Sequence, residues 1–285
     1  MARWLITGAG GMVGSDLRDA LALRDEPVTA LTKNDLDITD SRCVSACVAD
    51  ARPDVIVNCA AYTKVDQAEA EESAANAING SAVELLASAA NDVGALLVQI
   101  STDFVFDGRK GEPYEINDQT NPLSAYGRSK FLGETAARHA EKHVIVRTSW
   151  LFGQNGPNFV KAIRRQVDLG TNPLRVVNDQ RGRPTYTPHL AEAIIRLVAN
   201  DARGVVHYAD AEECTWYDFA CAIAPEATIV PVGTDEFPRP ATRPAYSVLS
   251  TERYERITGF TPASWREGLG EYLRASDTPR SPQRP

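Results

Sequence analysis

The sequence predicts an α/β fold, with a doubly wound parallel sheet and a second, smaller α/β lobe. Three observations support this prediction. Short β-branched runs alternate with longer helical patterns through the first half of the chain. The runs are nearly all apolar instead of alternating, as expected when helices cover both faces of a sheet. A glycine-rich turn lies between the first run and the first helical pattern, which is a common arrangement in such sheets.

The predicted strands of the first half are five short apolar runs: Trp4–Thr7, Val28–Thr32, Asp54–Asn58, Leu96–Ser101 and Val144–Thr148. Between them lie amphipathic or Ala-rich segments long enough to form right-handed crossover helices, at Val13–Leu23, Ser73–Val93 and Ser124–Ala140. We therefore expect one domain over residues 1–148.

After Trp150 the pattern loosens into clusters of Gly, Asn and Pro, which predicts a second lobe over residues 149–185 and 211–274. Within the gap between these ranges, the chain is expected to return to the first domain around residues 186–210. A helix over Pro188–Ala199 and a strand over Val205–Tyr208 would make this return. Residues 275–285 contain three prolines and almost no apolar side chain, so a disordered tail is expected there.

Composition narrows the class of protein. The chain has 285 residues, 43% hydrophobic and 24% charged, which disfavours disordered, collagen-like and coiled-coil structures. A net charge of −8 without a long basic run disfavours nucleic acid and anionic membranes as partners. Five cysteines without a CxxC pair favour reduced thiols over disulfides or zinc. With no leader-like start and no membrane-length apolar run, we expect a cytoplasmic protein.

Gly8, Gly11 and Gly14 form a GxxGxxG pattern directly after the first predicted strand. The first glycine permits a tight turn, the second lets the backbone approach a pyrophosphate, and the third allows close helix packing. The helix N-terminus that follows faces the anion. The pattern in this setting predicts a Rossmann-type dinucleotide site, the alternative being a purely structural turn.

The end of the second predicted strand bears on the choice of cofactor. NAD-specific folds often carry an acidic residue there that binds the adenosine ribose, whereas this chain has Thr32 and Lys33. A hydroxyl and a cation would accept a 2′-phosphate, which favours NADPH, with NADH also possible. Asp35 and Asp37 follow closely and offer an alternative contact to ribose, and Lys33 is equally compatible with a solvated surface position.

Tyr126 and Lys130 form a YxxxK pair on one face of a predicted helix. A nearby ammonium would lower the tyrosine pKa and make the phenol a proton donor or acceptor near neutral pH. The same ammonium would hold a nicotinamide ribose. Thr102, at the end of the fourth predicted strand, is placed to bind a substrate carbonyl. The structural alternatives are a helix-surface pair and a strand-end cap.

Several segments carry a family resemblance: Gly8–Gly14, NCAAYT at 58–63, STDFVFDG at 101–108, YGRSK at 126–130, RTSWLF at 147–152, DQRGRPT at 179–185 and RPAYSVL at 243–249. They resemble the extended short-chain dehydrogenase/reductases, and within these the dTDP-4-dehydrorhamnose reductase family. The resemblance runs to about Arg274. It implies reduction of the 4-keto group of dTDP-4-dehydro-β-L-rhamnose by NADPH or NADH, giving dTDP-β-L-rhamnose in dTDP-rhamnose biosynthesis.

The resemblance also implies roles for individual residues. Tyr126 would donate the proton, Lys130 would bind ribose, and Thr102 would act on the carbonyl. The further implied cofactor contacts are Gly11, Met12 and Val13 at the pyrophosphate, Asp37 and Ile38 near adenine, and Ala60, Ala61 and Tyr62 along the cofactor. The further implied sugar contacts are Thr102, Asp103 and Trp150. Arg183 and Arg243 are candidate diphosphate partners, because guanidinium forks match phosphate oxygens; surface ion pairs are the alternative.

Some properties of the family are in doubt for this chain. Some members dimerise around Mg²⁺, and Asp16 would supply one carboxylate, but Pro188 stands where the second is expected. No metal site is therefore predicted, and either a monomer or a homodimer is compatible. Two other functions stay open: an epimerase or dehydratase of the same fold, and a non-catalytic regulator resembling the methionine adenosyltransferase β subunit.

Overall fold

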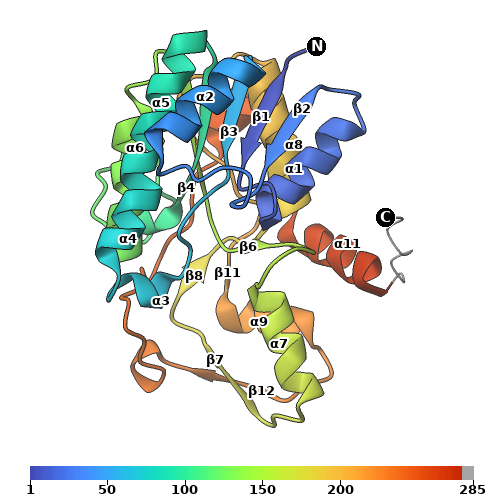
Figure 1. Ribbon diagram of the computed structural model, residues 1–285. Helices are drawn as coiled ribbons and strands as arrows, with labels where there is room; N and C mark the ends of the chain where they lie inside the picture. The colour runs from blue at the N-terminus through green and yellow to red at the C-terminus, as the bar shows by residue number, and fades with distance from the viewer. Residues whose placement is uncertain (278–285) are drawn as a thin grey trace.

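The computed structural model describes residues 1–277 and is built around one parallel sheet (Figure 1). Six strands lie in the order β10-β5-β4-β3-β1-β2 and all neighbours run parallel. Their bounds are β1 (Trp4–Thr7), β2 (Val28–Leu31), β3 (Val55–Asn58), β4 (Leu96–Thr102), β5 (His143–Thr148) and β10 (Gly204–His207). This arrangement confirms the predicted doubly wound α/β class.

Helices cover both faces of the sheet. On one face α1 (Met12–Ala22) packs on α8 (Thr187–Ala199), and on the other α2 (Ser41–Ala51), α5 (Ala82–Val93) and α6 (Ala125–Ala137) lie side by side. Ile6 of β1 belongs to the apolar cluster under α1 and α8, whereas its neighbour Leu5 belongs to the cluster under α2 and α5. Because successive side chains of a strand point to opposite faces, both faces must be apolar. This explains the continuous apolar runs of the sequence.

The single helix expected over Ser73–Val93 is divided into three parts. It comprises α4 (Glu72–Asn76), a π-helical turn η1 (Ala77–Ser81) and α5, with the short helix α3 (Val65–Ala68) before it. At this turn α6 approaches closely, since a Cβ on Gly133 would lie 2.1 Å from the carbonyl oxygen of Asn79. Periodicity alone does not reveal such a turn.

The second lobe lies below the parallel sheet in the view of Figure 1. Its elements are β6 (Leu151–Phe152), α7 (Phe159–Asp168), β7 (Leu174–Val177), β8 (Arg181–Gly182), β9 (Thr185–Tyr186), β11 (Cys214–Thr215), α9 (Trp216–Ile223), β12 (Ile229–Val232), the 3-10 turn η3 (Thr234–Glu236) and α11 (Trp265–Asp277). Helix α10 (Glu252–Thr258) packs instead on α8 and β10 of the first domain, and the 3-10 turn η2 (Asp103–Val105) directly follows β4. The strands form three two-stranded pairs, β7 with β12, β8 with β11 and β6 with β9. Phe152, Val160, Phe219 and Trp265 are buried in its core.

The segment that forms α8 and β10 returns to the first sheet between two stretches of the second lobe. The division of the chain into lobes stays a prediction.

The expected tail over residues 275–285 lies partly in a helix. Ala275, Ser276 and Asp277 belong to α11, so the expected disorder is wrong for these three residues. The rest of the expected tail, residues 278–285, lies outside the described residues. None of the described helices is long and apolar enough to cross a membrane.

Candidate active site

The glycine turn brings the backbone into contact at two points where a side chain would not fit. Gly8 has φ +64°, and a Cβ there would lie 2.5 Å from the backbone nitrogen of Ala60. A Cβ on Gly14 would lie 2.4 Å from the carbonyl oxygen of Gly8. Gly11 is the N-cap of α1, and Met12 and Val13 form its first turn. The amide groups of this turn have no acceptor within the helix, so the site suits a pyrophosphate.

Thr32 and Lys33 follow β2, the strand beside the one that leads into the glycine turn. A Cβ on Gly10 would lie 3.7 Å from the Thr32 methyl group, so Thr32 borders the glycine turn. Its amide and hydroxyl donate to Asp35 Oδ2 at 2.8 and 2.6 Å. Lys33 is exposed. The carboxylate of Asp35 therefore occupies the Thr32 donors, and the exposed Lys33 lies close enough to Asp37 for its charge to help lower the pKa of that carboxyl.

Asp37 and Ile38 continue the same segment. Asp37 Oδ1 accepts from the Thr39 hydroxyl at 2.7 Å and from its amide at 2.9 Å, and these hydrogen bonds lower the pKa of Asp37. Ile38 is buried in the cluster under α2. The carboxylate of Asp37 is thus held at the surface, whereas Ile38 contributes mainly packing.

The loop after β3 carries Ala60, Ala61 and Tyr62. Its course is fixed by Asn79 of the π-helical turn, which accepts from the Tyr62 amide at 2.8 Å and donates to the Tyr62 carbonyl at 3.0 Å. The phenol of Tyr62 donates to Glu71 at 2.7 Å. Ala60 packs against Gly8, as described above, so this loop lies directly beside the glycine turn.

Thr102 and Tyr126 meet at the carboxyl end of β4. Ser124 caps α6 by accepting from the Gly127 amide at 3.1 Å, which starts the helix just before Tyr126. A Cβ on Gly127 would lie 2.4 Å from the carbonyl oxygen of Phe104, so the first turn of α6 rests on the turn that follows Thr102. Burial raises the pKa of Tyr126 to about 12, and a hydrogen bond with Thr102 offsets part of this rise.

Lys130 projects from the next turn of α6 into the protein. It is only 3% exposed, and its Nζ donates to the carbonyl oxygen of Ile100 at 2.6 Å. Burial lowers the pKa of Lys130 to about 8, against an opposing effect of Glu134. The expectation that Lys130 lowers the pKa of Tyr126 is wrong in this structure. Burial and the charge of Asp103 raise the pKa of the phenol, because the ammonium is directed at the backbone of β4.

Asp103 is a buried acid beside this pair. Its residue is 2% exposed, its Oδ1 accepts from the Thr102 hydroxyl at 3.0 Å, and its Oδ2 has no hydrogen-bond partner within the described residues. Burial raises the pKa of Asp103 to about 6, and hydrogen bonds with Ser247 and Thr102 offset part of this rise. The carboxylate therefore has protein partners already, and its Oδ2 is the atom left for a ligand hydroxyl.

A cavity of about 880 Å³ extends from this point into the second lobe. Phe104 lies at its inner end, with its ring 5.8 Å from that of Tyr126. Trp150 lines the cavity and stacks on Trp216, with ring centroids 3.6 Å apart. Trp150 has φ +48°, a left-handed conformation that is unusual for an aromatic residue. The Trp150 indole is therefore fixed before any sugar arrives.

The two candidate arginines have different surroundings. Arg243 lines the cavity, and its guanidinium pairs with both carboxylate oxygens of Asp66 at 3.0 Å. Arg183 is not among the residues that line this cavity, and its Nε is buried without a hydrogen-bond partner in the described chain. Burial lowers the pKa of Arg183, and Glu213 is the leading negative charge that opposes this. The structure thus brings Arg243, but not Arg183, to the cavity.

The possible metal ligand Asp16 is otherwise engaged. It accepts a hydrogen bond from Thr187, and burial raises its pKa. Pro188 follows in the first turn of α8. Within residues 1–277 no cluster of three or more His, Cys, Asp or Glu side chains is arranged to hold a metal ion.

Several residues at the site were not predicted from the sequence: Asn79, Asp66, Trp216 and Ser247. Trp216 follows a capping box made by Thr215 and Asp218, a TxxD signal that marks the start of a helix and was available in the sequence. Asn79 and Asp66 act through partners far along the chain, and no local pattern marks them.

The chain is similar over nearly its whole length to known proteins. The family model described as RmlD substrate binding domain matches residues 2–278. A dTDP-4-keto-6-deoxy-D-glucose reductase of Streptomyces niveus is 44% identical over 91% of this chain and 92% of its own length. A dTDP-4-dehydrorhamnose reductase of Streptomyces griseus is 42% identical over 96% of this chain and 93% of its own. The crystal structure of dTDP-4-dehydrorhamnose reductase from Bacillus anthracis in complex with NADP has a TM-score of 0.92 and 38% identity, covering 96% and 99% of the two chains.

Proposed function

Because this chain belongs to the RmlD substrate-binding-domain family, we propose that it reduces the 4-keto group of dTDP-4-dehydro-β-L-rhamnose with NADPH or NADH, giving dTDP-β-L-rhamnose. It is an NAD(P)H-dependent oxidoreductase, as its reductase relatives and its likeness to an NADP complex show. The observation that carries the proposal is the hydrogen bond between Thr102 and Tyr126 at the carboxyl end of β4, next to Phe104 of the cavity wall, with Lys130 one helical turn further along α6.

The bound nicotinamide would supply the hydride to the carbonyl carbon. The glycine turn supports such a cofactor, since Gly8 and Gly14 bring the turn and α1 close together and Gly11, the N-cap of α1, carries no side chain that would keep a pyrophosphate from the helix N-terminus. Lys130, whose buried ammonium lies against the Ile100 carbonyl of β4, would hold the nicotinamide ribose.

Tyr126 would donate the proton to the carbonyl oxygen. A phenol whose pKa is raised to about 12 stays protonated throughout the neutral range, which suits an enzyme that works in the direction of reduction. An alkoxide is a stronger base than a phenolate, so transfer from Tyr126 is favourable once hydride has arrived. Thr102 would polarise the same carbonyl through its hydroxyl, and the unpaired Oδ2 of Asp103 would accept from a sugar hydroxyl.

The cavity would receive the nucleoside diphosphate. Phe104, Trp150 and Arg243 line it, and the ring of Phe104 lies beside that of Tyr126. A guanidinium matches the oxygens of a diphosphate, and the aromatic side chains offer a surface for the sugar.

The test is to mix the protein with dTDP-4-dehydrorhamnose and NADPH and to follow nicotinamide absorbance together with the product. Stoichiometric loss of NADPH and appearance of dTDP-rhamnose are expected, with Tyr126→Phe as the inactive control. Turnover without net loss of NADPH would instead indicate an epimerase or dehydratase. A wild-type chain that binds NADPH but reduces no dTDP-4-keto sugar would contradict the proposal and favour a regulator.

Three finer expectations stay predictions: a cytoplasmic location, a monomeric or homodimeric state, and the division of the chain into two lobes. All five cysteines are free thiols in the structure, which supports the first. Sedimentation of the purified chain would decide the second.

A further inference from the structure

Residues 241–250, here called the strap, form an extended segment of the second half of the chain that lines the cavity. Ala241, Thr242, Arg243, Pro244 and Ser247 all contribute to the cavity wall. The strap has no regular secondary structure beyond isolated bridges. Its position therefore depends on contacts with other elements, and these contacts occur at three places along its length.

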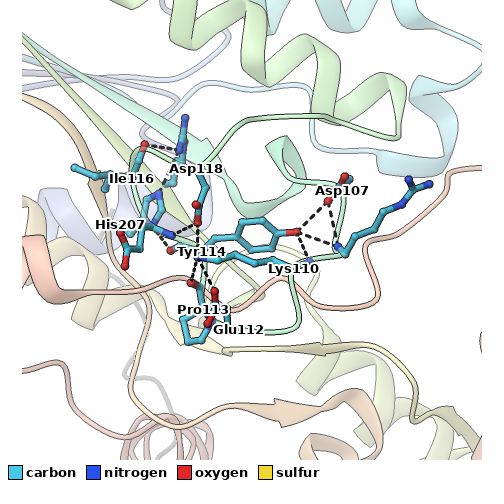
Figure 2. Close-up of polar contacts among 11 residues, drawn as sticks. Asp107, Lys110, Glu112, Pro113, Tyr114, Ile116, Asp118 and His207 are labelled. Atoms are coloured by element: carbon cyan, nitrogen blue, oxygen red, sulfur yellow. Dashed lines mark hydrogen bonds and ion pairs between the residues drawn. The ribbon is translucent and has the colours of Figure 1, made fainter.

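The far end of the strap is held by Tyr114. The Tyr114 amide donates to the Val248 carbonyl and its carbonyl accepts from the Ser250 amide, both at 2.8 Å. Figure 2 shows the contacts that fix Tyr114. Its hydroxyl donates to Asp107 and accepts from the Lys110 amide, and the Lys110 side chain is itself held by an ion pair with Asp118 at 2.7 Å. This end is a rigid anchor.

The middle of the strap pairs with the second lobe. The Arg181 amide donates to the Ala245 carbonyl and the Ser247 amide donates to the Arg181 carbonyl, both at 2.8 Å. On the other side the strap touches Gly108, where a Cβ would lie 2.6 Å from the Ala245 nitrogen. The middle is thus held between the two lobes.

The N-terminal end of the strap, at Ala241 and Arg243, is held by the side chain of Asp66 of α3. Its carboxylate accepts from Arg243 Nη1 and Nη2 at 3.0 Å each and from the Ala241 amide at 3.3 Å. The two side chains are 32% and 22% exposed. Asp66 is not among the residues that line the cavity, whereas Arg243 is. The carboxylate therefore holds the guanidinium from outside the cavity.

The hydrogen bonds leave one edge of Arg243 available. Nη1 donates to Asp66 and also to the Ala241 carbonyl at 2.9 Å, and Nη2 donates to Asp66. A guanidinium has five N–H groups, so Nε–H and one N–H of Nη2 carry no hydrogen bond within the described residues. These two groups form a second planar fork, suited to the oxygens of a phosphate.

We propose that Asp66 is a positioning residue for substrate binding: it fixes Arg243 so that the free Nε–Nη2 edge receives the diphosphate of the nucleotide sugar. The inference rests on the proposed function, because it takes a diphosphate as the ligand of this cavity. The proposal and simple electrostatics predict opposite changes in dTDP affinity when the Asp66 charge is removed. Removing a negative charge near an anion should tighten binding by simple electrostatics, whereas loss of the positioned fork should weaken it.

The test compares wild type with Asp66→Asn, using dTDP and thymidine as probes. The Kd for dTDP should rise about tenfold, the effect of losing one charged hydrogen bond, and the inhibition constant of thymidine should not change because it lacks the diphosphate. The KM for NADPH should stay unchanged, and the thermal midpoint should fall by no more than a few degrees, as expected for loss of one partly exposed ion pair. Asp54→Asn is the matched control. Asp54 also forms an ion pair with an arginine, Arg3, at an N–O distance of 3.1 Å, but neither residue lines the cavity.

Two further variants make the test decisive. In an Arg243→Met background, Asp66→Asn should weaken dTDP binding no further, and Arg243→Lys should weaken it although the charge is kept. An unchanged or lower Kd for dTDP in Asp66→Asn would overturn the inference, as would an undiminished effect in the Arg243→Met background. If Asp66→Asn does not fold, full dTDP affinity in Arg243→Lys overturns it. A wild-type chain that binds no dTDP would overturn the proposed function as well.

Discussion

Raising the pH above 8 should inactivate the enzyme through Lys130 and not through Tyr126. Burial lowers the pKa of Lys130 to about 8 and raises that of Tyr126 to about 12. The charged form of Lys130 therefore predominates below pH 8 and is lost above it. At pH 9 only about one Lys130 in eleven would carry its proton, so kcat/KM for NADPH should fall roughly tenfold between pH 7 and pH 9.

The assay is kcat/KM for NADPH from pH 6.5 to 10 at constant ionic strength, because this quantity reports the free enzyme. Lys130→Arg is the control variant, since a guanidinium stays charged over this range. Its rate is expected to be lower, but without the decline above pH 8. A wild-type profile that is flat to pH 10, or a decline that persists in Lys130→Arg, would refute the assignment.

Four other outcomes are expected. Tyr126→Phe should lower kcat by about two to four orders of magnitude with little change in NADPH affinity, as measured by steady-state kinetics and fluorescence titration. Lys33→Glu should shift the ratio of kcat/KM values toward NADH, and an unchanged ratio would mean that Lys33 does not meet the 2′-phosphate. EDTA should leave the rate intact, and a loss restored only by Mg²⁺ would contradict this. Burial lowers the pKa of His207 to about 3, so below pH 6.5 the unfolded chain binds a proton that the folded chain does not. The free energy of unfolding should therefore fall by about 2 kcal/mol at pH 5. Urea titrations should show this contribution in wild type and not in His207→Gln.

The sequence was most informative where function depends on local spacing. Gly8 was predicted to permit a tight turn and Gly14 to allow close helix packing, and the φ of +64° at Gly8 and the 2.4 Å from a Cβ on Gly14 to the Gly8 carbonyl agree with both predictions. The strands of the first sheet were predicted to within one or two residues at each end, since burial on both faces leaves a continuous apolar run.

Other features depend on contacts between distant parts of the chain. Asp66 and Arg243 are 177 positions apart, so only the fold reveals that they pair. Likewise, Lys130 is directed at the Ile100 carbonyl, which the YxxxK spacing does not indicate. The π-helical turn at Asn79 is associated with the close approach of Gly133 on another helix, a tertiary effect that helical periodicity does not record.

The position of β10 has a consequence for synthesis of the chain. Strand β5 ends at Thr148, and its outer partner β10 begins only at Gly204, more than fifty residues later. At ribosomal rates this interval lasts on the order of seconds. During that time β5 is an edge strand with unpaired backbone groups and no cover from α8, which is the kind of edge that recruits other chains. A fragment cut after residue 148 would keep that edge permanently and should aggregate, so nucleotide-binding fragments of this protein should extend through His207.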